Sequence, residues 1–194
     1  MSEYPIEISS TRLLLRPYRP GEGRLYVDMY RENGAHLMEF MPEELRGMKT
    51  EADGERQIQR MLHAWQDREL FIFGAWDTET GLYVGEAYLA NPDWTVPSLE
   101  LGYFVVATQT GRGFATEAGA AVVAVAFEQF SVERIDLQCQ ADNVASARVA
   151  ERLGFRLEGR QRQRDRKRDG DLVDRLWYGL LRAEWEAQRT SRPT

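Results

Sequence analysis

The chain has 194 residues and a net charge of -6, and 43% of its residues are hydrophobic, so we expect one ordinary globular domain over residues 1–194. The single cysteine, Cys139, excludes an internal disulfide and a cysteine-rich zinc site, and we expect no metal. No apolar run approaches the roughly 20 residues of a membrane span, and no secretion signal opens the sequence. With the lone cysteine, which fits a reducing compartment, this leads us to expect a cytoplasmic protein. The acidic net charge disfavours binding to nucleic acid.

The first part of the chain predicts one strand and two helices. An apolar run at Thr11–Arg16, ended by Pro17, predicts a strand, and Gly21 to about Asn33 has the pattern of a helix. Thr50 followed by Asp53 is typical of a capping box at the start of a second helix. Apolar residues continue that helix with the correct spacing at Ile58, Met61, Leu62 and Trp65.

A run of strands follows. Residues 70–76 and 82–90 predict two strands joined by the turn at 77–81, and residues 91–94 should end the second of them. A third strand is expected at Ser98–Ala107. These sequential strands indicate an antiparallel meander.

The second half of the chain alternates strands and helices. We expect a glycine-bearing loop at 110–115, a helix at 116–130 and a strand at 134–140. Asp142 or Asn143 should cap a helix that ends at Gly154, with a strand from Phe155 and a last strand at 172–181. This order predicts an α+β fold around one mixed sheet.

The loop between the third strand and the next helix is the most informative segment. Gly111-Arg112-Gly113-Phe114-Ala115-Thr116 opens a helix directly after a strand. The first N–H groups of a helix have no internal partner and lie at the positive end of its dipole, so they can bind a diphosphate. Arg112 would add a cation. The loop lacks the third glycine of a dinucleotide fingerprint and the Gly-Lys-Ser/Thr ending of an NTP-binding loop.

At these residues the chain resembles a known family. Residues 111–118 are similar to the acyl-CoA pyrophosphate loop of GCN5-related N-acetyltransferases (GNATs), and residues 143–146 with 151–155 are similar to the family's next motif. Thr11-Arg12-Leu13-Leu14-Leu15-Arg16-Pro17 and Leu157-Glu158-Gly159 resemble the RimJ/RimL branch, which acetylates ribosomal-protein N-termini. The similarity covers about Thr11 to Leu181.

The resemblance implies a splayed mixed sheet with helices on both faces and acetyl-CoA as co-substrate. It implies that backbone groups of Phe104, Val105 and Val106 pair with the pantetheine arm. The pyrophosphate would lie on Gly111, Arg112, Gly113, Phe114, Ala115 and Thr116. The family usually has Gln, Arg or an aromatic residue where this chain has Thr110, so we assign no specific contact to Thr110 or to its neighbour Gln109.

The acceptor would be a primary amine that attacks the thioester directly. A deprotonated α-amine costs about 1 to 1.4 kcal/mol near pH 7, whereas a deprotonated lysine costs roughly 4 to 5. The sequence offers carboxylates but no strong base, which favours an N-terminal α-amine. Glu100, at the start of the strand that leads to the loop, is the first candidate base, and Glu86 on the neighbouring strand is the second.

The leaving thiolate needs a proton or a hydrogen bond. Many members of the family have a tyrosine where this chain has Ala150, and Ser146 is a plausible replacement because the RimJ/RimL branch resembles the chain there. Asn143 would cap the helix or bond the pantetheine amide. Tyr103 and Tyr178 are interpreted as packing residues of strands, and His36 and His63 as surface or packing residues.

Two rival functions stay open. One is acetylation of a small amine, such as a polyamine or an aminoglycoside, at an acidic cleft formed by Glu43, Glu44, Glu51, Asp53 and Glu55. The other is a non-catalytic acyl-CoA-binding module, which the absent tyrosine allows. The basic stretch from Arg160 to Arg168 is interpreted mainly as a solvated hairpin, and the sequence leaves a homodimer open.

Overall fold

A computed structural model of the chain describes residues 6–37, 47–167 and 169–190. The chain divides into two compact units, which are described separately. The first unit comprises residues 1–88 and 103–118, and the second comprises residues 89–102 and 119–194. Strands β4 (Tyr83–Asp93) and β5 (Ser98–Val105) and helix α4 (Phe114–Glu128) contribute residues to both.

The strands pair through hydrogen bonds in the order β1-β2-β3-β4-β5-β6-β8-β7. The further strands are β1 (Ile8–Ser9), β2 (Leu13–Arg16), β3 (Phe71–Asp77), β6 (Arg134–Gln140), β7 (Arg156–Arg166) and β8 (Leu172–Leu181). Strands β5 and β6 run parallel, whereas β2 with β3, β6 with β8, and β7 with β8 run antiparallel. The predicted mixed sheet is therefore confirmed.

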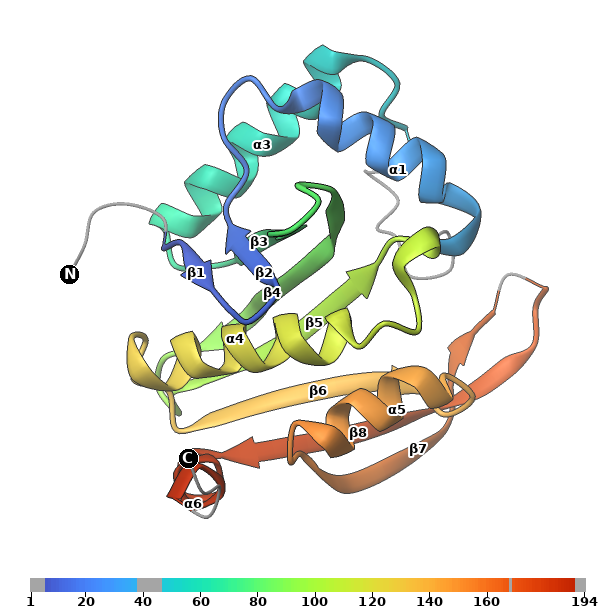
Figure 1. The fold of residues 1–194 in the computed structure, drawn as a ribbon. Coiled ribbons are helices and arrows are strands. Elements are labelled where there is room, and N and C mark those ends of the chain that lie inside the picture. Colours follow the sequence, from blue (N-terminus) through green and yellow to red (C-terminus); the bar gives the residue numbers. More distant parts are fainter. Residues whose placement is uncertain (1–5, 38–46, 168, 191–194) are drawn as a thin grey trace. The chain divides into compact units, whose positions relative to one another are not determined.

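In the first unit, helices α1 (Gly23–Leu37) and α3 (Glu51–Gln66) lie side by side (Figure 1). Helix α3 begins with the predicted capping box, in which Asp53 N–H donates to Thr50 Oγ1 at 3.2 Å and Thr50 N–H donates to Asp53 Oδ2 at 2.8 Å. Apolar residues of these helices, with Tyr18 after β2 and Val106 after β5, form one core, made of Tyr18, Tyr26, Met29, Ile58, Met61 and Val106. This core holds α1 and α3 against each other.

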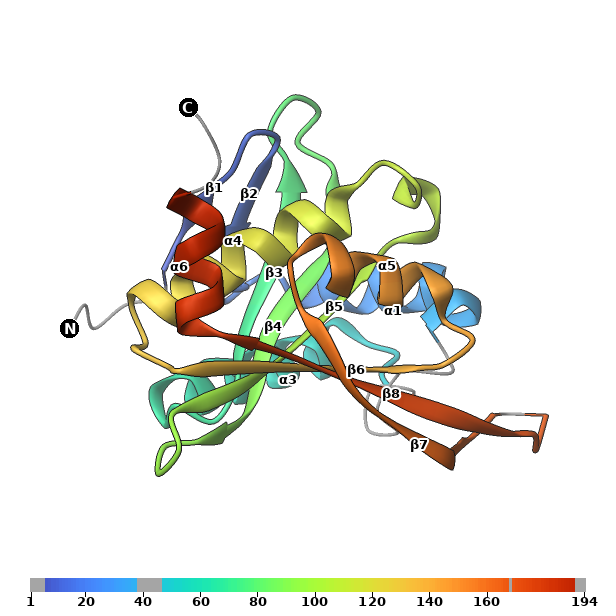
Figure 2. The ribbon, with the colours of Figure 1, turned by 90° about the horizontal axis from the view of Figure 1, so that it is seen from below.

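In the second unit, helix α5 (Val144–Arg152) contacts β6 and helix α6 (Arg182–Thr190) contacts β8. Figure 2 shows the β7–β8 hairpin extending well past α5. Side chains alternate along these strands because successive residues point to opposite faces. Leu99, Leu101, Ile135 and Leu137 are buried, with at most 2% exposure. The residues between them, Glu100 and Asp136 among them, point to the opposite face and carry the polar groups.

The structure differs from the sequence predictions at several element boundaries. Helix α4 begins at Phe114 and ends at Glu128, whereas a helix was predicted at residues 116–130. Strand β4 does not end at residue 90, as predicted, but continues to Asp93, because Asn91 adopts φ +51, a conformation that asparagine tolerates. Strand β5 ends at Val105 rather than Ala107, and residues 107–109 form the 3-10 turn η1 (Ala107–Gln109). Strand β1 and helix α6 were not predicted. No helix within the described residues is long and apolar enough to cross a membrane.

Candidate active site

The strand-to-helix junction of the first unit has the geometry of an anion site. Between β5 and α4, Gly111 and Gly113 adopt φ +77 and +82, a region that favours glycine. The first helical hydrogen bond runs from Glu117 N–H to Gly113 O at 3.1 Å. Helix geometry therefore leaves three amides without an intrahelical acceptor, those of Phe114, Ala115 and Thr116. Residues 111–113 are exposed, so the loop is accessible to a ligand.

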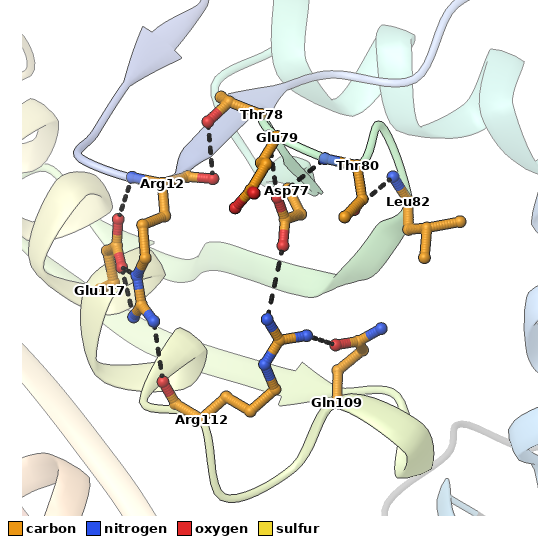
Figure 3. Close-up of polar contacts among 9 residues, drawn as sticks. All are labelled: Arg12, Asp77, Thr78, Glu79, Thr80, Leu82, Gln109, Arg112 and Glu117. Atoms are coloured by element: carbon orange, nitrogen blue, oxygen red, sulfur yellow. Dashed lines mark hydrogen bonds and ion pairs between the residues drawn. The ribbon is translucent and has the colours of Figure 1, made fainter.

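A network of side chains surrounds this loop (Figure 3). Arg12, from the turn before β2, donates from Nε to Glu117 Oε2 at 2.8 Å and from Nη1 to Arg112 O at 3.1 Å. Arg112 lies between Gln109, which accepts a hydrogen bond from its Nη1, and Asp77, whose Oδ2 is 3.8 Å from its Nη2. The guanidinium carbons of Arg12 and Arg112 lie 4.7 and 4.8 Å from the centre of the Phe114 ring.

These contacts explain why Thr110 and Gln109 were difficult to assign from the sequence. Thr110 Oγ1 donates to Ala107 O at 3.0 Å, so its hydroxyl closes the 3-10 turn. Gln109 supports Arg112. Both side chains therefore hold the loop in shape.

Val105, the last residue of β5, has backbone groups that point away from β4. Val106 N–H donates to Val84 O at 3.0 Å, so Val106 N–H is already engaged. Backbone groups alternate in direction along a strand, and those of Val105 consequently point the other way. The predicted pairing with a pantetheine arm, assigned to Phe104, Val105 and Val106, therefore depends most on Val105.

Glu86 is buried in the aromatic core of the first unit. Its side chain is on β4, the residue is 3% exposed, and Tyr18 Oη donates to Glu86 Oε1 at 2.6 Å. The hydroxyls of Tyr18 and Tyr83 lie 2.8 Å apart. Burial raises the pKa of Glu86 to about 7, although the hydrogen bond from Tyr18 opposes the rise. Glu86 can therefore exchange a proton near neutral pH.

Glu100 belongs to a row of polar side chains that crosses five strands of the second unit. Asn91 Nδ2 and Gln138 Nε2 both donate to Glu100 Oε2, at 2.8 and 3.1 Å. Arg175 Nη1 donates to Gln138 Oε1 at 3.0 Å, and Arg175 Nε donates to Asp165 Oδ2 at 2.9 Å. Both donors bind Oε2 of Glu100, and within the described part of the chain no hydrogen bond reaches its Oε1, which can accept from a further donor.

The row also fixes the orientation of the Gln138 amide. A guanidinium can only donate, so the atom of Gln138 that faces Arg175 must be its carbonyl oxygen. The amide nitrogen must then face Glu100, where it donates. Arg175 thus controls the hydrogen bond that holds the candidate base.

Asn143 and Ser146 lie at the start of α5, as predicted. Asn143 Oδ1 accepts a hydrogen bond from Ser146 N–H at 3.0 Å and caps the helix. Burial raises the pKa of the Cys139 thiol, and a hydrogen bond with Ser146 opposes that rise. The Ser146 hydroxyl therefore lies beside a thiol. Tyr178 and Ala150 are buried, at 3% and 0% exposure, and Tyr178 is a packing residue as expected.

The predicted site residues fall into two groups. The first unit brings together the loop residues and also contains Glu86, whereas Glu100, Asn143 and Ser146 belong to the second unit. The sequence did not predict the roles of Arg12, Tyr18, Gln138 and Arg175. The alternation of Gln138 with Cys139 along β6 could have indicated that Gln138 lies on the polar face of the sheet. The order of the strands, which brings Gln138 beside Arg175, has no such local signal. Among the described residues, no three His, Cys, Asp or Glu side chains are grouped as metal ligands.

Comparison with known proteins agrees with this geometry. The chain is 32% identical over 114 residues to a putative ribosomal N-acetyltransferase, YdaF, of Bacillus subtilis, a match that covers 56% of this chain and 59% of that protein. It is 24% identical to an uncharacterized N-acetyltransferase, YnaD, of the same organism, over 93% of this chain and 99% of that protein.

The fold is shared with solved acetyltransferases. RimL, a ribosomal-protein α-N-acetyltransferase solved in complex with coenzyme A, superposes with a TM-score of 0.81 at 20% identity, covering 91% of this chain and 98% of that chain. The acetyltransferase (GNAT) domain matches residues 12–156, about three quarters of the chain. The chain therefore belongs to the GNAT family of acetyltransferases, as its motifs predicted.

Proposed function

We propose that this protein transfers the acetyl group of acetyl-CoA to the α-amine of a protein or peptide N-terminus. The observation that carries the proposal is the α4 junction, where two glycines with positive φ precede three amides that lack an intrahelical acceptor. Such a terminus binds the diphosphate of a CoA thioester through backbone N–H groups. Membership of the GNAT family supports the donor, and the names of YdaF and RimL support the acceptor class.

The residues of the chain fit the parts of the donor. The loop from Gly111 to Thr116 would hold the diphosphate, and the outward-facing backbone of Val105 would pair with the pantetheine arm. The Val105 N–H, placed in this way, can donate to the thioester carbonyl, and loss of one such donor typically costs about 2.7 to 4 kcal/mol of transition-state stabilisation. Because these contacts come from the backbone, they bind any acyl-CoA with the same linker. We propose that both units act together as one acyltransferase domain.

The reaction needs one proton acceptor and one proton donor. The amine nitrogen forms a bond with the thioester carbonyl carbon, and the carbon–sulfur bond breaks. Glu100, through water at its open Oε1, takes the proton that the amine loses, and Glu86 is the second candidate. The Ser146 hydroxyl hydrogen-bonds the thiolate as it leaves. The thiolate then takes up a proton from solvent, and Glu100 returns to solvent the proton that it took from the amine, so the proton balance is closed. Positioning of the two substrates supplies much of the rate.

The ionisation of the acceptor favours an α-amine. Near pH 7 a lysine or polyamine nitrogen is roughly 3 kcal/mol harder to deprotonate than an α-amine. Two of the acidic residues that could form a cleft for a polyamine are engaged: Asp53 belongs to the capping box, and Glu55 Oε2 accepts a hydrogen bond from Gly21 N–H at 3.0 Å. Glu43 and Glu44, which the same rival requires, lie outside the described residues.

A thiol-release assay with a panel of amines tests the proposal. Acetyl-CoA is offered with N-terminal peptides, a polyamine and an aminoglycoside, and free coenzyme A is measured. We expect turnover with peptides that exceeds turnover with either small amine. Faster turnover of a small amine would favour that rival, and folded protein that binds coenzyme A without turnover of any amine would identify a binding module.

A further inference from the structure

We propose that Arg12 is a positioning residue of the diphosphate site. Its role would be to neutralise Glu117 and to orient the loop that holds the diphosphate. This inference rests on the proposed function, because it assigns a task to a residue beside the proposed donor site. It is carried by contacts within the first unit alone (Figure 3).

Glu117 creates an electrostatic problem at the site. It stands in the first turn of α4, and its side chain is only 16% exposed. A carboxylate there is attracted to the positive end of the helix, but it also repels a diphosphate bound at the same end. The pKa of Glu117 is lowered: burial works against this, and hydrogen bonds from Ser10 and Arg12 outweigh it. Glu117 is therefore ionised when the donor binds.

Arg12 and its neighbours compensate this negative charge. Arg12 Nη2 lies 2.7 Å from Glu117 Oε2, and Arg12 N–H donates to Glu117 Oε1 at 2.7 Å. Ser10 Oγ also donates to Oε1, at 2.7 Å. Each carboxylate oxygen thus has a donor or a cation from the turn before β2. With this charge neutralised, the amides at the start of α4 can attract an anion.

The same guanidinium fixes the loop. Arg12 Nη1 donates to Arg112 O at 3.1 Å. Because the peptide bond is planar and trans, the N–H of Gly113 must point opposite to the carbonyl of Arg112. Holding that carbonyl toward Arg12 therefore turns the Gly113 N–H away from Arg12. A Cβ placed on Gly113 would be 3.7 Å from Arg12 Nη2, so the guanidinium lies directly beside the loop backbone.

The contacts require the shape of arginine. Nε and Nη2 face Glu117 while Nη1 faces the carbonyl of Arg112, and a single ammonium group cannot hold these positions together. The backbone of Arg12 is itself anchored, since Thr78 N–H and Thr78 Oγ1 donate to Arg12 O at 2.8 and 3.1 Å. Lysine at this position would keep the charge but lose the fork.

The test is a double-mutant cycle on coenzyme A binding, measured by calorimetry. We expect Arg12→Met to raise the Kd for coenzyme A about tenfold, the usual scale for losing a charged hydrogen-bonding contact. The double variant Arg12→Met with Glu117→Gln should recover part of that loss because it removes the unneutralised carboxylate. Arg12→Lys should also bind more weakly than the wild type. Dephospho-coenzyme A, which retains the diphosphate, should show the same Arg12→Met effect.

A matched ion pair in the same unit provides the control. Arg19 and Glu7 are 60% and 51% exposed, and the cycle Arg19→Met with Glu7→Gln should leave the Kd unchanged. In steady state, Arg12→Lys should raise the KM for acetyl-CoA with little change in kcat. If Arg12→Met does not fold, the Kd for coenzyme A is compared between the wild type and Arg12→Lys, whose folding is checked by thermal unfolding.

Three results would overturn the proposal. The first is a Kd for coenzyme A within twofold of the wild-type value in folded Arg12→Met or Arg12→Lys. The second is a double variant that binds coenzyme A no better than Arg12→Met, and the third is an Arg12→Met effect that disappears with dephospho-coenzyme A. Folded wild-type protein that takes up no coenzyme A would contradict the proposed function instead. The two failures are therefore distinguishable.

Discussion

Gln138 donates a hydrogen bond from Nε2 to Oε2 of Glu100, across 3.1 Å and between neighbouring parallel strands. Arg175 holds the other end of the Gln138 amide, so the candidate base is oriented by residues of three further strands. The arrangement gives Glu100 one fixed oxygen and one open oxygen. A carboxylate that takes a proton through water requires this kind of fixed geometry.

The row of polar side chains predicts an effect of Gln138 on turnover. We expect Glu100→Gln to lower kcat by about 10² or more, the usual contribution of a general base. Gln138→Leu should lower kcat by less, because Glu100 remains but is no longer held. The KM for acetyl-CoA should change little in both. Gln161→Leu, at an exposed position of β7, is the matched control. Equal kcat in the Gln138 and Gln161 variants would show that the row has no role in catalysis.

Burial of Glu86 predicts a dependence of stability on pH. The pKa of Glu86 is about 7 in the folded protein, against 4.5 for an unperturbed glutamate. Between these pH values the unfolded state ionises first, so the folded state loses stability as pH rises. Above pH 7 the loss is complete, and at 1.36 kcal/mol per pKa unit it amounts to about 3 kcal/mol.

The substitution Glu86→Gln removes this ionisation and keeps an acceptor for Tyr18. Denaturant unfolding should show the variant gaining stability over wild type at pH 8 but not at pH 4.5. Glu32→Gln, at an exposed position of α1, should show no such trend. The same difference at both pH values would contradict the raised pKa.

Asn143 is predicted to have two separable tasks. Its Oδ1 caps α5, and its Nδ2, which no described residue binds, would donate to the pantetheine arm. Asn143→Ala should lower the free energy of unfolding by about 1 kcal/mol and raise the KM for acetyl-CoA. Asn143→Ser should restore the cap but not the KM. If serine restores both, the residue is a cap alone.

Gly113 should be required for donor binding by its backbone conformation. Alanine at φ +82 costs roughly 1 to 2 kcal/mol, and the strain would displace the amides that follow. We expect Gly113→Ala to lose stability and to raise the KM for acetyl-CoA. Gly81→Ala is the matched control, because Gly81 has φ +70 in the turn after β3, outside the loop. A KM that rises equally in both variants would show a general effect of destabilisation.

Local features of the fold were predictable because their signals are contained in a few consecutive residues. The capping box at Thr50, the cap at Asn143 and the bounds of β6 and β8 follow from caps and alternation. The predicted end of β4 was wrong because Asn91 and Pro92, residue types that usually mark a turn, lie here within the strand, with Asn91 at a positive φ.

The support around the site depends on contacts between distant residues. Tyr18 lies 68 positions before Glu86, and Arg12 lies 105 positions before Glu117. The row from Asn91 to Asp165 requires that β8, rather than β7, pairs with β6. No local pattern specifies that order, so the sequence indicated the candidate base but not the groups that hold it.

A matched pair of peptides distinguishes transfer to an α-amine from transfer to a lysine. One has a free N-terminal α-amine and an acetylated lysine, and the other has an acetylated N-terminus and a free lysine. Each is incubated with acetyl-CoA and the wild-type protein, and the product is located by mass spectrometry. We expect acetylation of the α-amine peptide alone, with one free coenzyme A released per acetyl group transferred. Acetylation of the lysine peptide at an equal or greater rate would contradict it.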